Sequence, residues 1–241
     1  MQKQYLIYGG SRGIGEALAR RLSAAGHKLH LVARDEARLA TIAGELGATF
    51  TVGSVEDEAL FGQVAAAMQG GLDGLAYCPG TLNLRALQRL TAADFARDFR
   101  IHALGAALAV QASLPALKLA EAASVVFFSS VAVRQGFASH ASVAMAKGAV
   151  EGLTLSLAAE LAPRVRVNAI APSLTVTPLT AGLTANEKMA EGLAQAHPLQ
   201  RLGRADDPAA LAAFLLGDEA SWMTGQIIGV DGGRGTLRTK G

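Results

Sequence analysis

A glycine-rich turn lies between a short apolar run and a helix-forming segment near the start of the chain. The apolar run covers 5–8, glycines follow at positions 9, 10, 13 and 15, and the segment 16–22 has the composition of a helix. Glycine lets the backbone turn sharply and approach a ligand closely, and free N–H groups at a helix start hold negative charge. Other turns also use glycine, but a buried strand before and an amphipathic helix after it favour a site for a nucleotide pyrophosphate.

Strands and helices alternate along the rest of the chain, with no linker, composition break or internal repeat between them. Repeated strand–helix–strand units imply a parallel sheet with right-handed crossovers. We therefore expect one α/β domain over 1–241, a Rossmann-type doubly wound parallel sheet of about seven strands with helices on both faces. The predicted strands are 5–8, 28–33, 48–52, 74–78, 124–128, 164–169 and 226–230, and the predicted helices are 16–22, 34–46, 56–68, 91–112, 143–161 and 207–216.

Composition narrows the class of protein. Apolar residues make up 51% of the chain and aromatics 5%, which suits parallel strands buried on both faces. The net charge is +2 with acidic and basic residues interspersed, so neither a nucleic-acid nor a membrane surface is indicated. The first apolar run is too short for a signal peptide, and no apolar stretch suffices to cross a bilayer. The single cysteine, Cys78, excludes an internal disulfide and fits a reducing compartment. We expect a cytoplasmic protein without a metal site.

Motifs of one known enzyme family occur along nearly the whole chain. The turn from Gly9 to Gly15 has the form Gly-x-x-x-Gly-x-Gly, Ser129-Ser130 follows the fifth strand, and Lys147 opens a run typical of the family's lysine helix. The segment 167–177 matches Val-Asn-x-x-x-Pro-Gly-x-x-x-Thr with Ser173 for the usual Gly, and 201–204 and 224–233 match a C-terminal signature. Together these motifs resemble the short-chain dehydrogenase/reductase family. The resemblance implies an oxidoreductase that moves hydride between a nicotinamide cofactor and a small molecule.

The resemblance also indicates the cofactor. Binders of NAD commonly place a carboxylate at the end of the second strand, where this chain has Ala33, while Arg12 lies in the glycine turn and Arg34 follows the strand. A guanidinium holds a 2′-phosphate bidentately, so we expect NADP(H). The alternative is that both arginines are surface charges with Asp35 as a local partner. The cofactor-binding residues implied by the resemblance are Gly9, Ser11, Arg12, Gly13, Ile14, Gly15, Arg34, Ser54, Val55, Gly80, Lys147 and Thr177.

The residues expected to perform chemistry depart from the family pattern. In the family a Tyr exchanges the proton, a Ser positions the substrate oxygen, a Lys holds the ribose and lowers the Tyr pKa, and an Asn supports a water. Ser130 and Lys147 match, but the spacing puts Val143 at the Tyr and His102 at the Asn. The predicted catalytic residues are Ser130, Lys147 and His102. For His102 a structural role, hydrogen-bonded to backbone, is an equal alternative to a proton relay.

Two functions remain open at this point. One is an NADP(H)-dependent oxidoreductase acting on a carbonyl, hydroxyl or imine-like small molecule with altered acid–base chemistry. The other is an NADP(H)-binding sensor or scaffold protein without turnover. His140, in the loop before the lysine helix, is a second candidate imidazole or a surface residue, and Ser139 and Ser142 are weaker donors.

The last predictions concern the substrate and the assembly. The segment 178–203 lacks a clean period and resembles the family's substrate-covering segment. Apolar residues in and beside it either line a pocket or only cover the core: Leu174, Leu179, Leu183, Met189 and Leu193. By resemblance, the helices near Thr91 and Val143 join subunits in a homodimer or homotetramer, although burial in the core also explains their small-residue faces.

Overall fold

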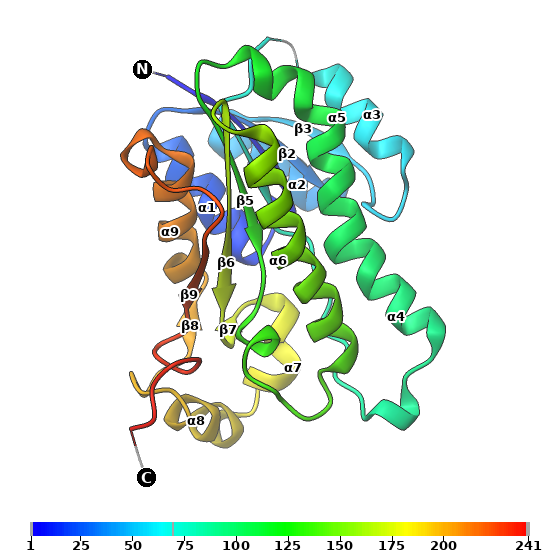
Figure 1. Ribbon diagram of the computed structural model, residues 1–241, viewed down its shortest axis with the longest axis vertical. Helices are drawn as coiled ribbons and strands as arrows, with labels where there is room; N and C mark the ends of the chain where they lie inside the picture. The colour runs from blue at the N-terminus through cyan, green and yellow to red at the C-terminus, as the bar shows by residue number, and fades with distance from the viewer. Residues whose placement is uncertain (1, 69, 240–241) are drawn as a thin grey trace.

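A seven-stranded parallel sheet forms the centre of the computed structural model, which describes residues 2–68 and 70–239 (Figure 1). Positions 1, 69 and 240–241 of the expected 1–241 domain lie outside the described residues. The strand order is β3-β2-β1-β4-β5-β6-β9, and a separate two-stranded pair joins β7 to β8. The central strands are β1 (Gln4–Tyr8), β2 (Lys28–Ala33), β3 (Thr49–Val52), β4 (Gly74–Tyr77), β5 (Ala123–Phe128), β6 (Val165–Pro172) and β9 (Ile227–Val230), and the pair is β7 (Thr175–Val176) and β8 (Gly203–Arg204). The doubly wound fold predicted from the sequence is confirmed.

Helices cover both faces of the sheet because successive strand residues point to opposite sides. Leu6 packs into a cluster with α3, α5 and α6, whereas its neighbour Ile7 packs into a cluster with α1, α2 and α9. The α-helices are α1 (Gly13–Ala24), α2 (Glu36–Leu46), α3 (Ala59–Ala67), α4 (Ala92–Phe99), α5 (Gly105–Leu119), α6 (Ala141–Leu161), α7 (Ala181–Thr184), α8 (Glu187–Gln195) and α9 (Asp206–Leu216). None of the helices in the described residues is long and apolar enough to span a membrane.

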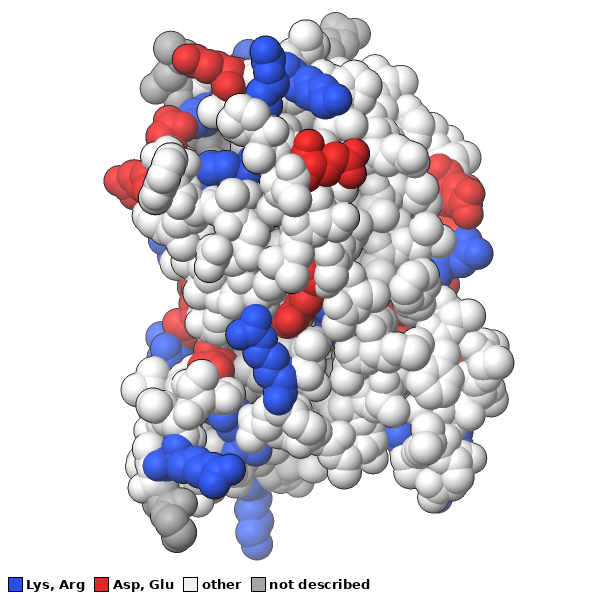
Figure 2. Space-filling model, in the orientation of Figure 1, with Lys and Arg blue, Asp and Glu red and all other residues white. Residues whose placement is uncertain are grey.

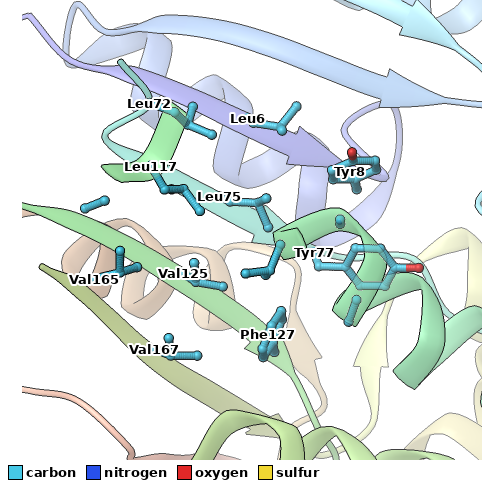
Figure 3. Close-up of a cluster of buried hydrophobic side chains, with 14 of the residues drawn as sticks. Leu6, Tyr8, Leu72, Leu75, Tyr77, Leu117, Val125, Phe127, Val165 and Val167 are labelled. Atoms are coloured by element: carbon cyan, nitrogen blue, oxygen red, sulfur yellow. The ribbon is translucent and has the colours of Figure 1, made fainter. Parts of the chain in front are cut away.

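Two tyrosines belong to the first of these clusters rather than to a surface or cleft. Figure 3 shows Tyr8 on β1 and Tyr77 on β4 among buried aliphatic side chains and Phe127. The Tyr77 hydroxyl donates to the main-chain oxygen of Ile101 at 2.6 Å. Burial raises the pKa of both phenols, because the phenolate is poorly solvated there. These side chains therefore build the core.

Several element ends differ from the predictions, and local polar groups explain two of them. The predicted helix 56–68 begins only at Ala59. The Ser54 side chain accepts from the Glu56 N–H and the Asp57 side chain from the Ala59 N–H, and these two hydrogen bonds stabilise non-helical turns before the helix starts. The predicted helix 34–46 begins at Glu36, because Asp35 accepts from the Arg38 N–H and caps it.

The predicted helix 91–112 is longer than expected. The Thr91–Asp94 capping box is present, and a π-helical turn over Arg100–Leu104 joins α4 to α5. The helix then continues through Pro115 to Leu119. A π-turn inserts an extra residue into the hydrogen-bond ladder and is frequent at functional sites. Here it carries His102.

Candidate functional site

The glycine turn between β1 and α1 forms a tight cradle. Gly9 has φ +76°, a left-handed conformation that favours glycine, and a Cβ on Gly15 would collide with the Gly9 main-chain oxygen. Arg12 precedes α1 and offers it no side-chain cap, so the first N–H groups of that helix are left for another acceptor. This geometry fits a phosphate at the helix start. Ser11 and Ile14, the other two expected residues of the turn, are buried and half-buried.

Arginine side chains gather beside this turn. Arg12 forms an ion pair with Asp35. The Arg38 N–H and then the Arg12 guanidinium lower the pKa of the Asp35 carboxyl. Arg34 is exposed and forms no ion pair within the described chain. Arg38, which the sequence reasoning missed, donates to the Ser11 oxygen at 2.7 Å and pairs with Glu16 at 2.9 Å. Asp35 is thus the local partner of Arg12 rather than of Arg34.

A cavity of about 430 Å³ opens at the carboxyl ends of β4, β5 and β6, the edge at which open parallel sheets bind ligands. It brings together six of the predicted site residues, which come from the glycine turn, the loops after β4 and β5, the π-turn, α6 and the loop after β7: Ile14, Gly80, His102, Ser130, Lys147 and Thr177. Ser54 and Val55 follow β3 outside this cavity. Within the described ranges, no three His, Cys, Asp or Glu side chains are placed to hold a metal ion.

Lys147 is the central cation of the cavity. Its Nζ donates to the Phe128 main-chain oxygen at 2.6 Å, which anchors the side chain against the end of β5. Burial lowers the pKa of Lys147 to about 8, with Cys78 opposing the shift. Ser130, also in the lining, accepts from the Ala132 N–H at 3.1 Å, and its own hydroxyl proton can still be donated to a substrate oxygen.

His102 is held by a buried polar network. Thr81 contacts its Nε2 through both main-chain nitrogen (3.1 Å) and hydroxyl (2.9 Å), and the same hydroxyl donates to Asp98 at 2.6 Å. Ser142 donates to the other Asp98 oxygen at 2.6 Å. Nδ1 of His102 is buried without a hydrogen-bond partner among the described residues. The backbone contact fits the structural role foreseen for His102, and the residue also contributes to the lining of the cavity.

The charge state of His102 follows from its burial. The side chain is 2% exposed, and desolvation, with Lys147 nearby, lowers the pKa of His102 to about 2. At pH 7 the imidazolium would lie about 7 kcal/mol above the neutral ring. His102 is therefore neutral at pH 7. It can donate or accept a hydrogen bond, but it is not a general acid at that pH.

Val143 lies one helical turn before Lys147 on α6, and its side chain lines the same cavity. It is 5% exposed. The chain has three tyrosines, and none of them lines the cavity. Tyr5, the third, is buried in the cluster on the other face of the sheet.

The segment 178–203 folds into η4 (Pro178–Thr180), α7 and α8, which contribute apolar side chains to the cavity. Leu174, Leu179, Leu183 and Leu193 line it, as the sequence suggested. Met189 does not: it is 49% exposed on the outer side of α8, so that prediction was wrong. His140 also lines the cavity.

Thr81, Asp98 and Arg234 belong to the site or touch it, and the sequence reasoning missed all three. Asp98 carried a usable signal: it lies four residues before His102, and residues so spaced share a helix face. Arg234 carried no such signal, because its place beside the cavity depends on how the chain turns after β9.

Comparison with known proteins agrees with this geometry. The family model described as enoyl-(acyl carrier protein) reductase matches residues 9–234. A tropinone reductase homolog of Arabidopsis thaliana is 35% identical over 240 residues, covering 95% of this chain and 88% of the relative. The solved short-chain dehydrogenase/reductase of Mycobacterium ulcerans superimposes with a TM-score of 0.92 at 30% identity, covering 99% and 92% of the two chains.

A solved complex of a related fold contains a cofactor. The structure described as ElxO with NADP bound has a TM-score of 0.90 at 26% identity and covers 98% of this chain and 100% of its own. Sequence motifs, fold and cavity thus agree with one another. The chain belongs to the short-chain dehydrogenase/reductase family of oxidoreductases, which use nicotinamide cofactors.

Proposed function

We propose that this protein is an NADP(H)-dependent oxidoreductase that reduces a carbonyl or imine, or oxidises the matching hydroxyl compound, with Ser130, Lys147 and His102 as its catalytic residues. Its acid–base chemistry differs from the family pattern, because Val143 and His102 replace Tyr and Asn. The observation that carries the proposal is Lys147, a cation with a pKa of about 8 in the lining of the cavity.

The choice of NADP(H) rests on the arginines beside the glycine turn. Arg12 and Arg34 flank the end of β2, and Arg34 is exposed without a carboxylate partner in the described chain. A guanidinium at this place binds the 2′-phosphate of NADP(H), whereas the 2′-hydroxyl of NAD(H) needs no cation. The NADP complex of ElxO supports the same choice. The bound cofactor supplies or accepts the hydride.

The proton comes from Lys147. At pH 7 the Lys147 Nζ is mostly protonated, and its pKa of about 8 lets it release a proton near the operating pH. His102 cannot replace it as a source, because its pKa is about 2. Val143 has no proton to give. Lys147 therefore carries a proton at pH 7 and can release it near that pH, inside the lining of the cavity.

Ser130 and His102 position the substrate oxygen. The Ser130 hydroxyl donates to that oxygen while its lone pair accepts from Ala132. The contacts of Thr81 with Nε2 fix the His102 ring in the lining of the cavity, and its Nδ1 has no hydrogen-bond partner among the described residues. Because Nε2 accepts from the Thr81 N–H, the neutral ring carries its proton on Nδ1, and His102 acts as a fixed hydrogen-bond donor rather than as a proton relay.

An easily protonated or activated substrate suits this site best. Positioned acid–base catalysis contributes about 10²–10⁴ in rate, which is roughly 3–5 kcal/mol of barrier. Without the tyrosine, part of this rate acceleration is lost. The orientation of the cofactor and the substrate lowers the barrier independently of any acid. Activated ketones and iminium compounds therefore turn over faster than plain ketones. Tropinone, named for the Arabidopsis relative, belongs in the test panel.

Stopped-flow single turnover tests the proposal. Protein loaded with NADPH is mixed with a panel of imines, activated ketones and plain ketones, and NADPH absorbance is followed. We expect hydride loss with at least one activated substrate and none with Lys147→Met. Tight NADPH binding without hydride loss across the panel would instead favour the alternative, a cofactor-binding sensor or scaffold protein, which Val143 motivates.

Subunit association is part of the same proposal. Along α6, an exposed stripe of small and apolar residues repeats at helical spacing: Met145, Gly152, Leu155 and Ala159. A Cβ on Gly152 would meet no atom within 4 Å, so nothing in this chain covers that position. The surface over α5 and α6 carries few charged side chains in Figure 2. A second copy packing its own α6 there gives the expected homodimer, or half of a homotetramer.

A further inference from the structure

Arg234 is a cation at the edge of the cavity, beside the apolar part of its lining. It follows β9 and lines the same cavity as Lys147 and Ser130. The apolar part of the lining includes Leu82, Leu84, Phe137, Leu179, Leu183 and Leu193. Along the described chain, no Asp or Glu belongs to the lining. A guanidinium in such surroundings keeps an uncompensated positive charge beside the place where a substrate would lie.

The Arg234 side chain is fixed in place without being neutralised. Its Nη1 donates to the Ala196 main-chain oxygen at the end of α8. Its Cζ lies 5.5 Å from the centre of the Phe137 ring, a cation–π contact. Considering residues 2–68 and 70–239, no carboxylate comes within ion-pair distance of it. One hydrogen bond and one aromatic face leave further N–H donors of the five that the guanidinium carries.

A pre-positioned guanidinium with free donors binds a planar carboxylate bidentately. A single guanidinium balances one negative charge, whereas a phosphate monoester carries about −1.5 to −2 and would need a second cation. Lys147 is held at Phe128 and serves the reacting end of the cavity. The charge count therefore favours a carboxylate over a phosphate.

We propose that Arg234 selects substrates that carry a carboxylate on an apolar, ring-sized body, with the carboxylate at Arg234 and the reacting carbon toward Ser130 and Lys147. This inference rests on the proposed function in one respect, that the cavity holds the substrate. It also implies that cationic ketones such as protonated tropinone bind less well than anionic ones of similar size.

The test measures binding, so it does not depend on turnover. The probes are three acids of increasing reach, cyclohexanecarboxylate, cyclohexylacetate and 3-cyclohexylpropionate, each paired with its primary amide. Each is titrated by calorimetry into the full-length protein, alone and saturated with NADP⁺. We expect at least one acid to bind about tenfold or more tightly than its amide, a difference of about 1.4 kcal/mol.

Three variants assign the preference to the side chain. Arg234→Gln keeps a hydrogen-bond donor but removes the charge, and we expect it to abolish the preference for the acid. Arg234→Lys keeps the charge, so part of the preference should survive. Arg238→Gln is the matched control, since Arg238 is exposed four residues away and outside the cavity lining. It should leave the preference unchanged. Melting temperatures establish that each variant is folded.

The possible outcomes separate this inference from the proposed function. Equal binding of every acid and its amide by the wild type would overturn the inference, even if Arg234→Gln failed to fold. A preference that survives in folded Arg234→Gln would overturn it as well. Turnover of neutral ketones without any acid preference would refute only this inference. An acid preference without turnover of any substrate would refute the proposed reaction and leave this inference standing.

Discussion

Val143 and Lys147 lie one helical turn apart on α6, and both side chains line the same cavity. A phenol at position 143 would stand beside the Lys147 ammonium, which would favour its ionised form and make it a better acid. We expect Val143→Tyr to raise the single-turnover rate constant for reduction of a plain ketone by about 10²-fold, the low end of positioned acid catalysis.

Val143→Phe separates chemistry from size. It adds the same ring without the hydroxyl, so it should bring no gain, and any loss it causes measures crowding in the cavity. A wild-type rate constant equal to or above that of folded Val143→Tyr would contradict the view that this site lacks a strong acid at position 143.

Asp35 competes with the expected 2′-phosphate for Arg12. Its carboxylate pairs with that guanidinium and also caps α2. Asp35→Asn keeps a capping side chain but frees Arg12, so NADPH should bind severalfold more tightly while NADH changes little. Fluorescence titration of both cofactors measures this. The control is Asp206→Asn. Asp206 is an exposed acidic residue at the start of α9, and it pairs with Arg21 on α1. Equal effects on NADPH and NADH would refute the assignment of the phosphate site.

His102 links folding to pH. Its pKa is about 2 in the folded chain and 6.5 in the unfolded chain. Between these values the unfolded chain binds a proton that the folded chain does not, so stability falls as pH falls below 6.5. Well inside that window the contribution is about 1.4 kcal/mol per pH unit. His102→Asn should flatten the slope by about that amount in urea unfolding series from about pH 4 to 5.5. An unchanged slope would mean that His102 becomes protonated in the folded protein.

The exposed stripe on α6 predicts a self-association surface. Leu155 is 52% exposed on that stripe, and Leu155→Glu places a charge where two copies would meet. We expect the subunit affinity to fall at least tenfold, about 1.4 kcal/mol, in sedimentation velocity runs at several concentrations. Leu119→Glu is the control, because Leu119 is 72% exposed at the end of α5 and is not one of the stripe residues on α6. A wild type that sediments as a monomer would refute the predicted assembly.

The fold could be predicted from the sequence because its signals are local and repeated. Most of the central strands are apolar runs that end near Gly, Pro, Ser or a charged residue, and the glycine turn fixes how the first unit begins. The helix ends were less predictable because side-chain caps decide them. Ser54 and Asp57 delay the start of α3 through two hydrogen bonds that no periodicity reveals.

The site was only partly predictable, for a different reason. Motifs located Ser130, Lys147 and His102, and the cavity brings them together. The network from Asp98 through Thr81 to His102 joins segments separated in sequence, and the burial of His102 decides its charge. Met189 was misplaced because apolar character alone does not say which face of α8 meets the cavity.

The central claim, that Lys147 supplies the proton, is tested most directly by the pH dependence of single-turnover reduction. Desolvation lowers the pKa of Lys147 from 10.5 to about 8, so its ammonium form declines as pH rises through 8. With NADPH-loaded wild-type protein and an activated ketone, we predict a rate constant that is level below pH 8 and falls tenfold per pH unit above it. Lys147→Met should lose the reaction while remaining folded. A rate constant independent of pH from 6 to about 10, or full activity in folded Lys147→Met, would contradict the claim.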